Sequence, residues 1–231
     1  MIRVIFTALL LLVTTCAKAT EKPVVLVLLV EYPPYLSQQM EGGGILFGYL
    51  DSVLQHEDWQ VRYLYQPVAR VVKDIEGHNW LIATYNKVSA EHHELLTLEK
   101  DVPGVILVRR REKTPFLIKE EIIDSKAQLA WLNGMDDLGL LKEAGLDEVE
   151  RVNVNSIDQG MKMLVNNRVD YLLCFVDACD YSLKQAGIDK SLVQYSDTVR
   201  KFPFHLLLNK NHPLADRIRE YLKPKLIKPD S

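Results

Sequence analysis

The stretch VVLVLLV-EYPPY, residues 24–35, decides the fold class of this chain. Residues 24–30 form a continuous aliphatic run rich in β-branched valine, which is typical of a strand buried on both faces of a parallel sheet. Pro33 and Pro34 follow almost directly, and because proline cannot donate to a ladder of hydrogen bonds, the strand must end before them. Aromatic and acidic side chains therefore stand at the carboxyl end of the first strand.

Helical and extended patterns alternate along the rest of the chain. Apolar residues recur at helical spacing over residues 46–54, and Pro67 opens a second helix as a first-turn proline. The segment Ser156-Ile157-Asp158-Gln159 is a capping box that begins a third helix. Further strands are expected at 80–84, 105–108, 127–132, 152–154, 169–176 and 204–208, and further helices at 136–144 and 213–222, with a helical turn at 182–186. Such alternation predicts βαβ units with right-handed crossovers.

The alternation occurs twice, which predicts two lobes. A hydrophilic stretch at residues 109–113 interrupts it, and the chain is expected to return to the first lobe near residues 201–204. We therefore expect an α/β, two-lobed fold, each lobe a mostly parallel sheet flanked by helices. The first lobe would hold residues 22–109 and 204–231, the second would be inserted as residues 110–203, and a ligand cleft would lie between them.

The N-terminus predicts export. Residues 1–19 contain an early cation, an apolar run at 4–13 that is too short to span a bilayer, and the triplet Ala17-Lys18-Ala19, which together are typical of a secretory signal peptide. A short anchor helix and lipid modification at Cys16 remain as alternatives, although Thr15 stands where a lipoprotein signal has Gly, Ala or Ser. We expect a periplasmic protein.

Two cysteines remain after removal of such a leader, and an oxidising compartment permits them to pair. Cys174 and Cys179 are five residues apart. A bridge is geometrically possible only if the strand around Cys174 stops by about Val176, so that Cys179 folds back from the next turn. A disulfide and two buried thiols both remain open at this point.

Composition and motifs exclude several functions. With 28 Lys and Arg against 31 Asp and Glu, a net charge of −3 and no long block of like charge, the chain lacks the electrostatic footprint of a nucleic-acid-binding protein. No nucleophile elbow or HExxH run is present, so an enzyme is not expected. The adjacent pair His92-His93 points to opposite sides of any regular element, which disfavours a metal site, and no cofactor is expected.

Several short motifs resemble one protein family. In chain order they are Tyr32-Pro33-Pro34-Tyr35, Gly48-Tyr49-Leu50-Asp51, Pro67-Val68-Ala69-Arg70, Asn167-Arg168-Val169-Asp170 and residues 202–210. As a set they resemble the family 3 extracellular solute-binding proteins, the two-lobed type II periplasmic binding proteins associated with polar amino acid transport. The resemblance implies closure on a small polar solute (amino acid, amine or peptide-like) and, as partner, the membrane permease of an ABC importer. The alternative is a ligand-sensing or regulatory protein that signals to a membrane kinase or cyclase, including one with a degenerate pocket.

The chain departs from that family where a ligand carboxylate would be bound. Thr84 matches the family, but Glu91-His92 stands where the resemblance implies an arginine that grips the carboxylate as a bidentate fork. Lys87 either substitutes for that arginine or faces solvent. Asp136 and Asp137 occupy the start of an expected helix, where they either neutralise an anion site or simply cap the helix. These departures favour a cationic, amidic or peptide-like ligand over an ordinary α-amino acid.

Candidate ligand-binding residues follow the ends of the expected strands. Aromatic side chains there either stack on a ligand or cation or pack a proline turn, and a carboxylate there either accepts an ammonium group or caps the next turn. The arginine of the second helix resembles a family position that supports lobe closure more than it touches ligand, and Trp80 and Trp131 are expected in the core. The candidates are Tyr32, Tyr35, Arg70, Tyr85, Asn86, Asn133 and Asp177.

Overall fold

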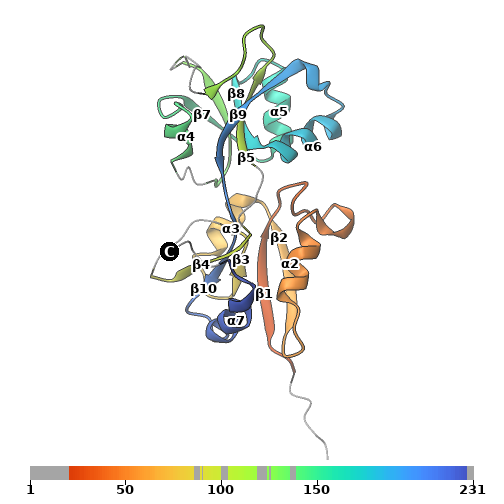
Figure 1. Cartoon of the computed structure of the whole chain (residues 1–231), viewed down its shortest axis with the longest axis vertical. Helices are drawn as coiled ribbons and strands as arrows, with labels where there is room; N and C mark the ends of the chain where they lie inside the picture. The colour runs from red at the N-terminus through yellow and green to blue at the C-terminus, as the bar shows by residue number, and fades with distance from the viewer. Residues whose placement is uncertain are drawn as a thin grey trace, which may run out of the picture.

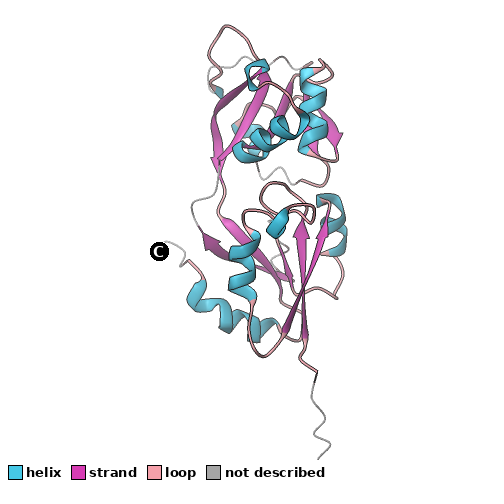
Figure 2. Cartoon of the chain, turned by 90° about the vertical axis from the view of Figure 1, so that its right-hand side faces the viewer, coloured by secondary structure: helices cyan, strands magenta, loops and turns pink. Residues whose placement is uncertain are grey.

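The computed structural model describes residues 21–85, 89, 91–99, 104–118, 124, 126–135 and 139–227, which form two lobes stacked along the long axis of the molecule (Figure 1). Among these residues each lobe holds one five-stranded sheet. Helices lie against the faces of both sheets, as the view turned by 90° also shows (Figure 2). The predicted two-lobed α/β fold class is confirmed. The expected leader at residues 1–19 and the residues Asn86, Lys87, Asp136 and Asp137 lie outside the described residues.

The first lobe combines the start and the end of the chain. Its strands pair in the order β2-β1-β3-β10-β4. Its elements are β1 (Val24–Val30), α2 (Phe47–Leu54), β2 (Gln60–Gln66), α3 (Val68–Asp74), β3 (Ile82–Ala83), β4 (His93–Glu99), β10 (Phe204–Asn209) and α7 (Ala215–Leu222).

The second lobe is formed by the middle of the chain, and its strands pair in the order β7-β6-β8-β5-β9. Its elements are β5 (Gly104–Arg110), β6 (Gln128–Leu132), α4 (Leu140–Glu143), β7 (Glu150–Val154), α5 (Ile157–Val165), β8 (Tyr171–Phe175), α6 (Val176–Ala186) and β9 (Val193–Lys201). Short 3-10 turns lie at Glu41–Gly43, Lys190–Leu192 and Lys223–Lys225.

Both sheets are mixed rather than mostly parallel. Strand β1 is parallel to β2 and β3, and β10 is antiparallel to β3 and β4. In the second lobe β6 is parallel to β7 and β8, whereas β5 is antiparallel to β8 and β9. The parallel pairs are those joined through helices, as βαβ units require. The antiparallel pairs involve the strands next to the crossings between the lobes, where the chain changes direction.

The first lobe boundary differs from the expectation. The sequence reading placed residues 105–108 in the first lobe, but β5 pairs with β8 and β9 in the second sheet, so the crossing precedes Gly104. The charged residues 109–113 mark the end of a strand instead of a boundary. The guanidinium of Arg109 is buried, 5% exposed, and donates to the carbonyl oxygens of Thr114 and Pro115, so it holds a loop within the second lobe. The return crossing lies between β9 and β10.

The position of β1 between helices on both faces of the sheet explains why its sequence is apolar throughout. Val25, Val27 and Leu29 pack with α2 and α7 on one face of the sheet. Leu28 and Val30 pack with α3 on the other face. A strand covered by helices on both faces has no solvent side and therefore shows no polar alternation. Its carboxyl end consequently has a fixed position, and the residues that follow it point toward the second lobe (Figure 1).

Several elements were missed or misplaced by the sequence reading. Strands β2, β4 and β9 carry polar residues and were not expected. Helix α6 spans eleven residues where only a turn at 182–186 was expected, and the strand before it ends at Phe175. In the part of the chain that the structure describes, no helix has the length and apolar character needed to cross a bilayer.

Replacement of Ser156 by alanine tests the capping box. The Ser156 hydroxyl accepts a hydrogen bond from the Gln159 amide at 3.1 Å, and the Gln159 side chain accepts from the Asn155 amide at 2.8 Å. Ser156→Ala should lower the free energy of unfolding by about 1 kcal/mol in a urea titration, because an N-cap acceptor is lost. The control is Ser52→Ala on the exposed face of α2, which should change it by less than about 0.5 kcal/mol. Equal losses in both variants would contradict the capping role.

Candidate functional site

The turn after β1 presents two tyrosine rings to the second lobe. The amide of Tyr32 donates to the carbonyl of Leu36 at 2.8 Å, and the amide of Leu36 donates back to Tyr32 at 3.2 Å, which closes a tight turn around the two prolines. The rings of Tyr32 and Tyr35 lie 6.1 Å apart at an angle of 25°. The carbonyl of Tyr35 also accepts from the amide of Leu46 at 3.0 Å. These backbone hydrogen bonds thus fix the turn that carries both rings.

The partner of these rings is the junction between β8 and α6. The ring of Phe175 meets Tyr32 and Tyr35 edge-on, with both centroid distances at 5.8 Å. The hydroxyl of Tyr35 donates to the carboxylate Oδ2 of Asp177 at 3.1 Å. The amide of Phe175 donates to the hydroxyl oxygen of Tyr32 at 3.5 Å. We call these four residues the aromatic contact.

Burial and charge keep the tyrosines of the aromatic contact protonated. Burial raises the pKa of Tyr35 far above its ordinary value, and the negative charge of Asp177 raises it further. Burial likewise raises the pKa of Tyr32. The Tyr35 hydroxyl therefore stays a hydrogen-bond donor to Asp177 at physiological pH.

A second contact joins the lobes beside α3. The hydroxyl of Tyr85, which follows β3, donates to the carbonyl of Gly134 in the turn after β6 at 2.7 Å. Gly134 has a φ of +85°, and a Cβ at this position would lie 2.6 Å from the Cα of Ala69. Leu132 packs with Val68 in the same apolar cluster. A residue with a side chain cannot replace Gly134 without moving one lobe away from the other.

The structure brings only some of the predicted candidates together. Tyr32, Tyr35 and Asp177 share the aromatic contact, and Tyr85 lies in the second contact. Asn86 lies outside the described residues. The remaining two candidates have other partners. Arg70 is exposed and pairs with Asp74 on its own helix at 3.2 Å, and the Asn133 side chain is exposed, while its amide donates to Val154 at 2.8 Å.

The segment expected to hold a carboxylate clamp has other contacts. The Thr84 hydroxyl oxygen accepts from the amide of Val30 at 3.0 Å, so it joins the ends of β3 and β1. Glu91 and His92 are exposed, and the His92 ring lies 3.2 Å from the side-chain amide of Asn211. Glu91 and His92 therefore make no part of the contacts between the lobes described above.

Both tryptophans named from the sequence are core residues. Trp80 is 2% exposed, and its indole N–H donates to the carbonyl of Gly77 at 3.0 Å. Trp131 is 4% exposed and donates to the carbonyl of Met135 at 3.3 Å. Each has a satisfied donor and buried rings, which is the ordinary state of a core tryptophan.

Phe175 and Gly134 are the two contact residues that sequence reasoning missed. Phe175 lies in the apolar run at residues 171–176 and has the pattern of a strand residue, although its position two residues before Asp177 was a usable signal. Gly134 follows the candidate Asn133 in an Asn-Gly pair, which is typical of a turn. Both residues matter because of what they face in the other lobe, and no local pattern encodes that.

Cys174 and Cys179 form a disulfide at the same junction. Their Cα atoms are 6.1 Å apart and both side chains are fully buried. The bridge fits because β8 ends at Phe175 and α6 begins at once, which turns Cys179 back toward the strand.

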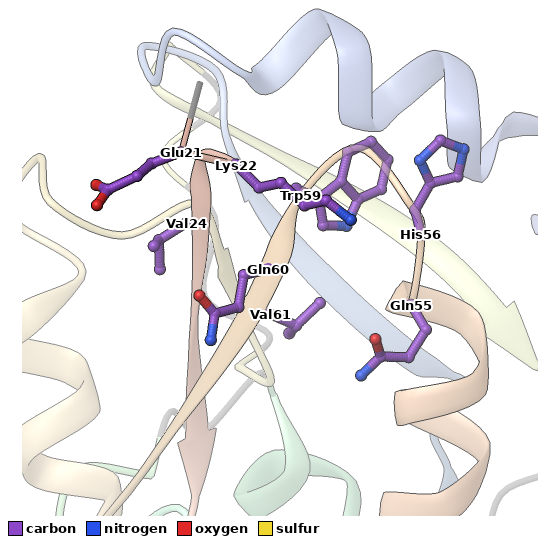
Figure 3. Close-up of a pocket in the computed structure, with 8 residues that line it drawn as sticks. All are labelled: Glu21, Lys22, Val24, Gln55, His56, Trp59, Gln60 and Val61. Atoms are coloured by element: carbon purple, nitrogen blue, oxygen red, sulfur yellow. The ribbon is translucent and has the colours of Figure 1, made fainter. Parts of the chain in front are cut away.

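A separate cavity lies on the first lobe, at the opposite end of β1 from Tyr32 (Figure 3). Its volume is about 690 Å³, and its lining is mixed in polarity. His56 stacks on Trp59 at a centroid distance of 4.4 Å, and the indole N–H of Trp59 donates to Leu54 at 2.9 Å. The lining residues are Glu21, Lys22, Val24, Gln55, His56, Trp59, Gln60 and Val61. These aromatic groups are engaged with their own lobe, and the cavity takes no part in the contact between lobes.

A Gly134→Ala variant tests whether the second contact sets the distance between the lobes. The added Cβ meets the Ala69 backbone, so the lobes should separate and the radius of gyration measured by small-angle X-ray scattering should increase. Gly187→Ala is the matched control, because Gly187 has a φ of +62° with no atom within 4 Å of an added Cβ. It carries the same left-handed strain and should leave the radius unchanged. An unchanged radius in folded Gly134→Ala would contradict the assignment.

Stability at alkaline pH tests the buried state of Tyr35. Since its pKa is raised in the folded protein, the unfolded chain releases this proton first as the pH rises through about 10. The folded state then loses up to about 1.4 kcal/mol per pH unit through this group. Tyr35→Phe should therefore show a shallower decline than the parent in urea titrations between pH 9 and 11. Parallel declines would show that Tyr35 titrates alike in both states.

The chain resembles known proteins in its structure but not in its sequence. No protein-family model matches the chain, and no curated protein sequence is similar to it. The GluR0 ligand-binding core from Nostoc punctiforme, solved with L-glutamate, has a TM-score of 0.65 at 15% identity, covering 87% of this chain and 92% of that one. The amino acid ABC transporter substrate-binding protein AbpA from Streptococcus pneumoniae, bound to L-arginine, has a TM-score of 0.66 at 10% identity, covering 88% and 87%.

A third similar structure comes from a larger protein. The periplasmic domain of BvgS from B. pertussis has a TM-score of 0.64 at 14% identity over 87% of this chain, which spans 40% of that one. At these identities the likeness concerns the fold. The chain has the two-lobed fold of the periplasmic binding proteins, and its structural neighbours are consistent with the resemblance to the family 3 solute-binding proteins.

Proposed function

We propose that this chain is a periplasmic solute-binding protein that closes its two lobes on a small, amine-bearing polar solute and delivers it to the permease of an ABC importer. The observation that carries the proposal is the carboxylate of Asp177, which faces the first lobe and accepts the hydroxyl of Tyr35 at 3.1 Å. The expected leader at residues 1–19 makes export part of the proposal. Binding, and not catalysis, is the activity proposed.

The chemistry of the aromatic contact suits a cation. An ammonium or guanidinium group would give Asp177 a hydrogen bond in which both partners are charged, whereas the Tyr35 hydroxyl is a neutral donor to the same carboxylate. The rings of Tyr32, Tyr35 and Phe175 would add cation–π attraction, up to about 2 kcal/mol in a desolvated site. A cationic solute would thus replace the Tyr35 hydroxyl at Asp177. The arginine bound by AbpA is a solute of this class, and it supports the proposal.

An acidic solute fits this chain less well. Glu91-His92 occupies the place of the arginine that would grip a carboxylate, and both residues are exposed. Asp177 would repel a second carboxylate. A solute that carries an amine and depends little on a carboxylate is therefore proposed over glutamate.

Closure follows from differential affinity. The lobes already touch through the aromatic contact and the Tyr85–Gly134 hydrogen bond. A solute that contacts both lobes stabilises their closed arrangement in proportion to its preference for it, tenfold in population for every 1.4 kcal/mol. The closed arrangement would then be what a membrane permease recognises.

A second function is favoured by the same contacts. Side chains of the chain itself join the two lobes, so closure can be regulated by whatever weakens these contacts. The BvgS periplasmic domain has the same fold within a larger protein. A regulatory role, with signalling to a membrane kinase or cyclase, is the alternative proposal.

Isothermal titration calorimetry with L-arginine, putrescine and L-glutamate tests the first proposal. The parent should bind the two cationic probes more tightly than glutamate. Asp177→Asn should weaken that binding at least tenfold, since hydrogen bonds to charged groups contribute about 1.5–3 kcal/mol. Tyr35→Phe is the matched variant, because it keeps the ring and removes the competing hydroxyl, so it should bind the cationic probes at least as well as the parent.

Two results would contradict this proposal. Glutamate bound most tightly would show that another group replaces the carboxylate clamp. The lack of heat with every probe in both the parent and Tyr35→Phe would favour the regulatory alternative.

A further inference from the structure

We infer that the Cys174–Cys179 disulfide positions the β8–α6 junction for contact with the first lobe, and that closure of the lobes depends on this bridge. The inference concerns the lobe contact on which the proposed function relies. It requires no solute, so it can be tested whether or not the probes named above bind.

The start of α6 has no side-chain cap. Phe175 is the N-cap residue of α6, with φ −72° and ψ 145°, and no side chain caps the helix there. A helix start normally gains its first hydrogen bonds from a Ser, Thr, Asp or Asn at this position. Here the covalent bridge joins the strand at Cys174 to the first turns of α6 at Cys179. The bridge thus orients the start of α6 relative to β8, which a side-chain cap does in other helices.

Four residues lie inside the ring that the bridge closes, and two of them make the aromatic contact. Phe175 supplies its ring to Tyr32 and Tyr35, and its amide donates to the Tyr32 hydroxyl oxygen. Asp177 supplies the carboxylate for the Tyr35 hydroxyl. Both residues are therefore held on a short cyclic segment whose backbone has few alternatives. Such pre-organisation lowers the conformational entropy lost when a contact forms.

The bridge is poorly suited to a purely stabilising role. In the chain-entropy view a disulfide stabilises the fold more as the loop that it closes grows longer, and this bridge joins cysteines only five residues apart. Both sulfurs also lie in an apolar cluster with Met161 and Leu183, where buried thiols would pack without a bond. The main effect of the bond is therefore local, on the direction of Phe175 and Asp177.

The experiment compares the oxidised parent with the double variant Cys174→Ala/Cys179→Ala, without added solute. Hydrogen–deuterium exchange followed by mass spectrometry reports on two peptides, one covering residues 31–37 of the first lobe and one covering residues 171–180. Without the bridge, both peptides should exchange at least tenfold faster, and the radius of gyration from small-angle X-ray scattering should increase. Residues 31–37 belong to the other lobe, but Tyr35 packs in the same apolar cluster as the bridge, so a control that destabilises this cluster and keeps the bridge is required.

Leu183→Ala is the matched control, because it removes a buried side chain from the same apolar cluster on α6 and leaves the bridge intact. It should lower the melting temperature and leave exchange in residues 31–37 at the parent rate. Parent-like exchange and radius in the double variant would overturn the inference. Unfolding of the second lobe on loss of the bridge, in the variant or in the parent reduced with a phosphine, would also overturn it, because the bridge would then hold the lobe and not the junction.

Discussion

The packing of Phe175 against Tyr32 and Tyr35 is the interaction on which the arrangement of the two lobes depends. Each lobe has its own sheet and its own apolar clusters, so neither needs the other in order to form a core. The orientation of one lobe against the other therefore relies on the contacts that cross between them. Edge-to-face aromatic pairs contribute about 1 kcal/mol each beyond the area they bury, and buried hydrogen bonds a similar amount. Together these contacts amount to a few kcal/mol, which is enough to populate a closed arrangement and small enough for a bound group to change it.

The polar pair within this contact gives it a chemical preference. Tyr35 remains protonated because burial and the neighbouring carboxylate both raise its pKa, so Asp177 has a neutral donor as its partner. A cation is a stronger partner for a half-buried carboxylate than a hydroxyl is. The segment that would favour a carboxylate ligand offers Thr84 to the backbone of β1 and leaves Glu91 and His92 in solvent. The charged groups of both lobes thus favour a cationic ligand over an acidic one.

Elements with a strong local signal were predicted well. Strand β1 is apolar because both its faces are covered, and the Ser156 hydroxyl caps α5 by accepting from the Gln159 amide, as the spacing predicts. The Gln159 side chain accepts from the Asn155 amide and not from the N-cap amide that a capping box predicts. Strands β2, β4 and β9 were missed because polar residues on them are tolerated at edges and beside crossings. The run at residues 109–113 was interpreted as a boundary because charge is usually exposed, yet Arg109 is buried among carbonyl oxygens.

In the candidate site, too, local sequence determined some features and contacts between distant segments decided the others. The sequence by itself determined the two-lobed α/β class, the end of β1 at the prolines, and the presence of Tyr32, Tyr35 and Asp177 at strand ends, because periodicity and proline act over a few residues. Only the tertiary structure decided that β5 belongs to the second sheet, that Phe175 and Asp177 are the partners of the two tyrosines, and that Arg70 pairs with Asp74 on its own helix. The first two of these facts depend on contacts between segments more than sixty residues apart, and local patterns carry no information about which distant side chain will complete a contact.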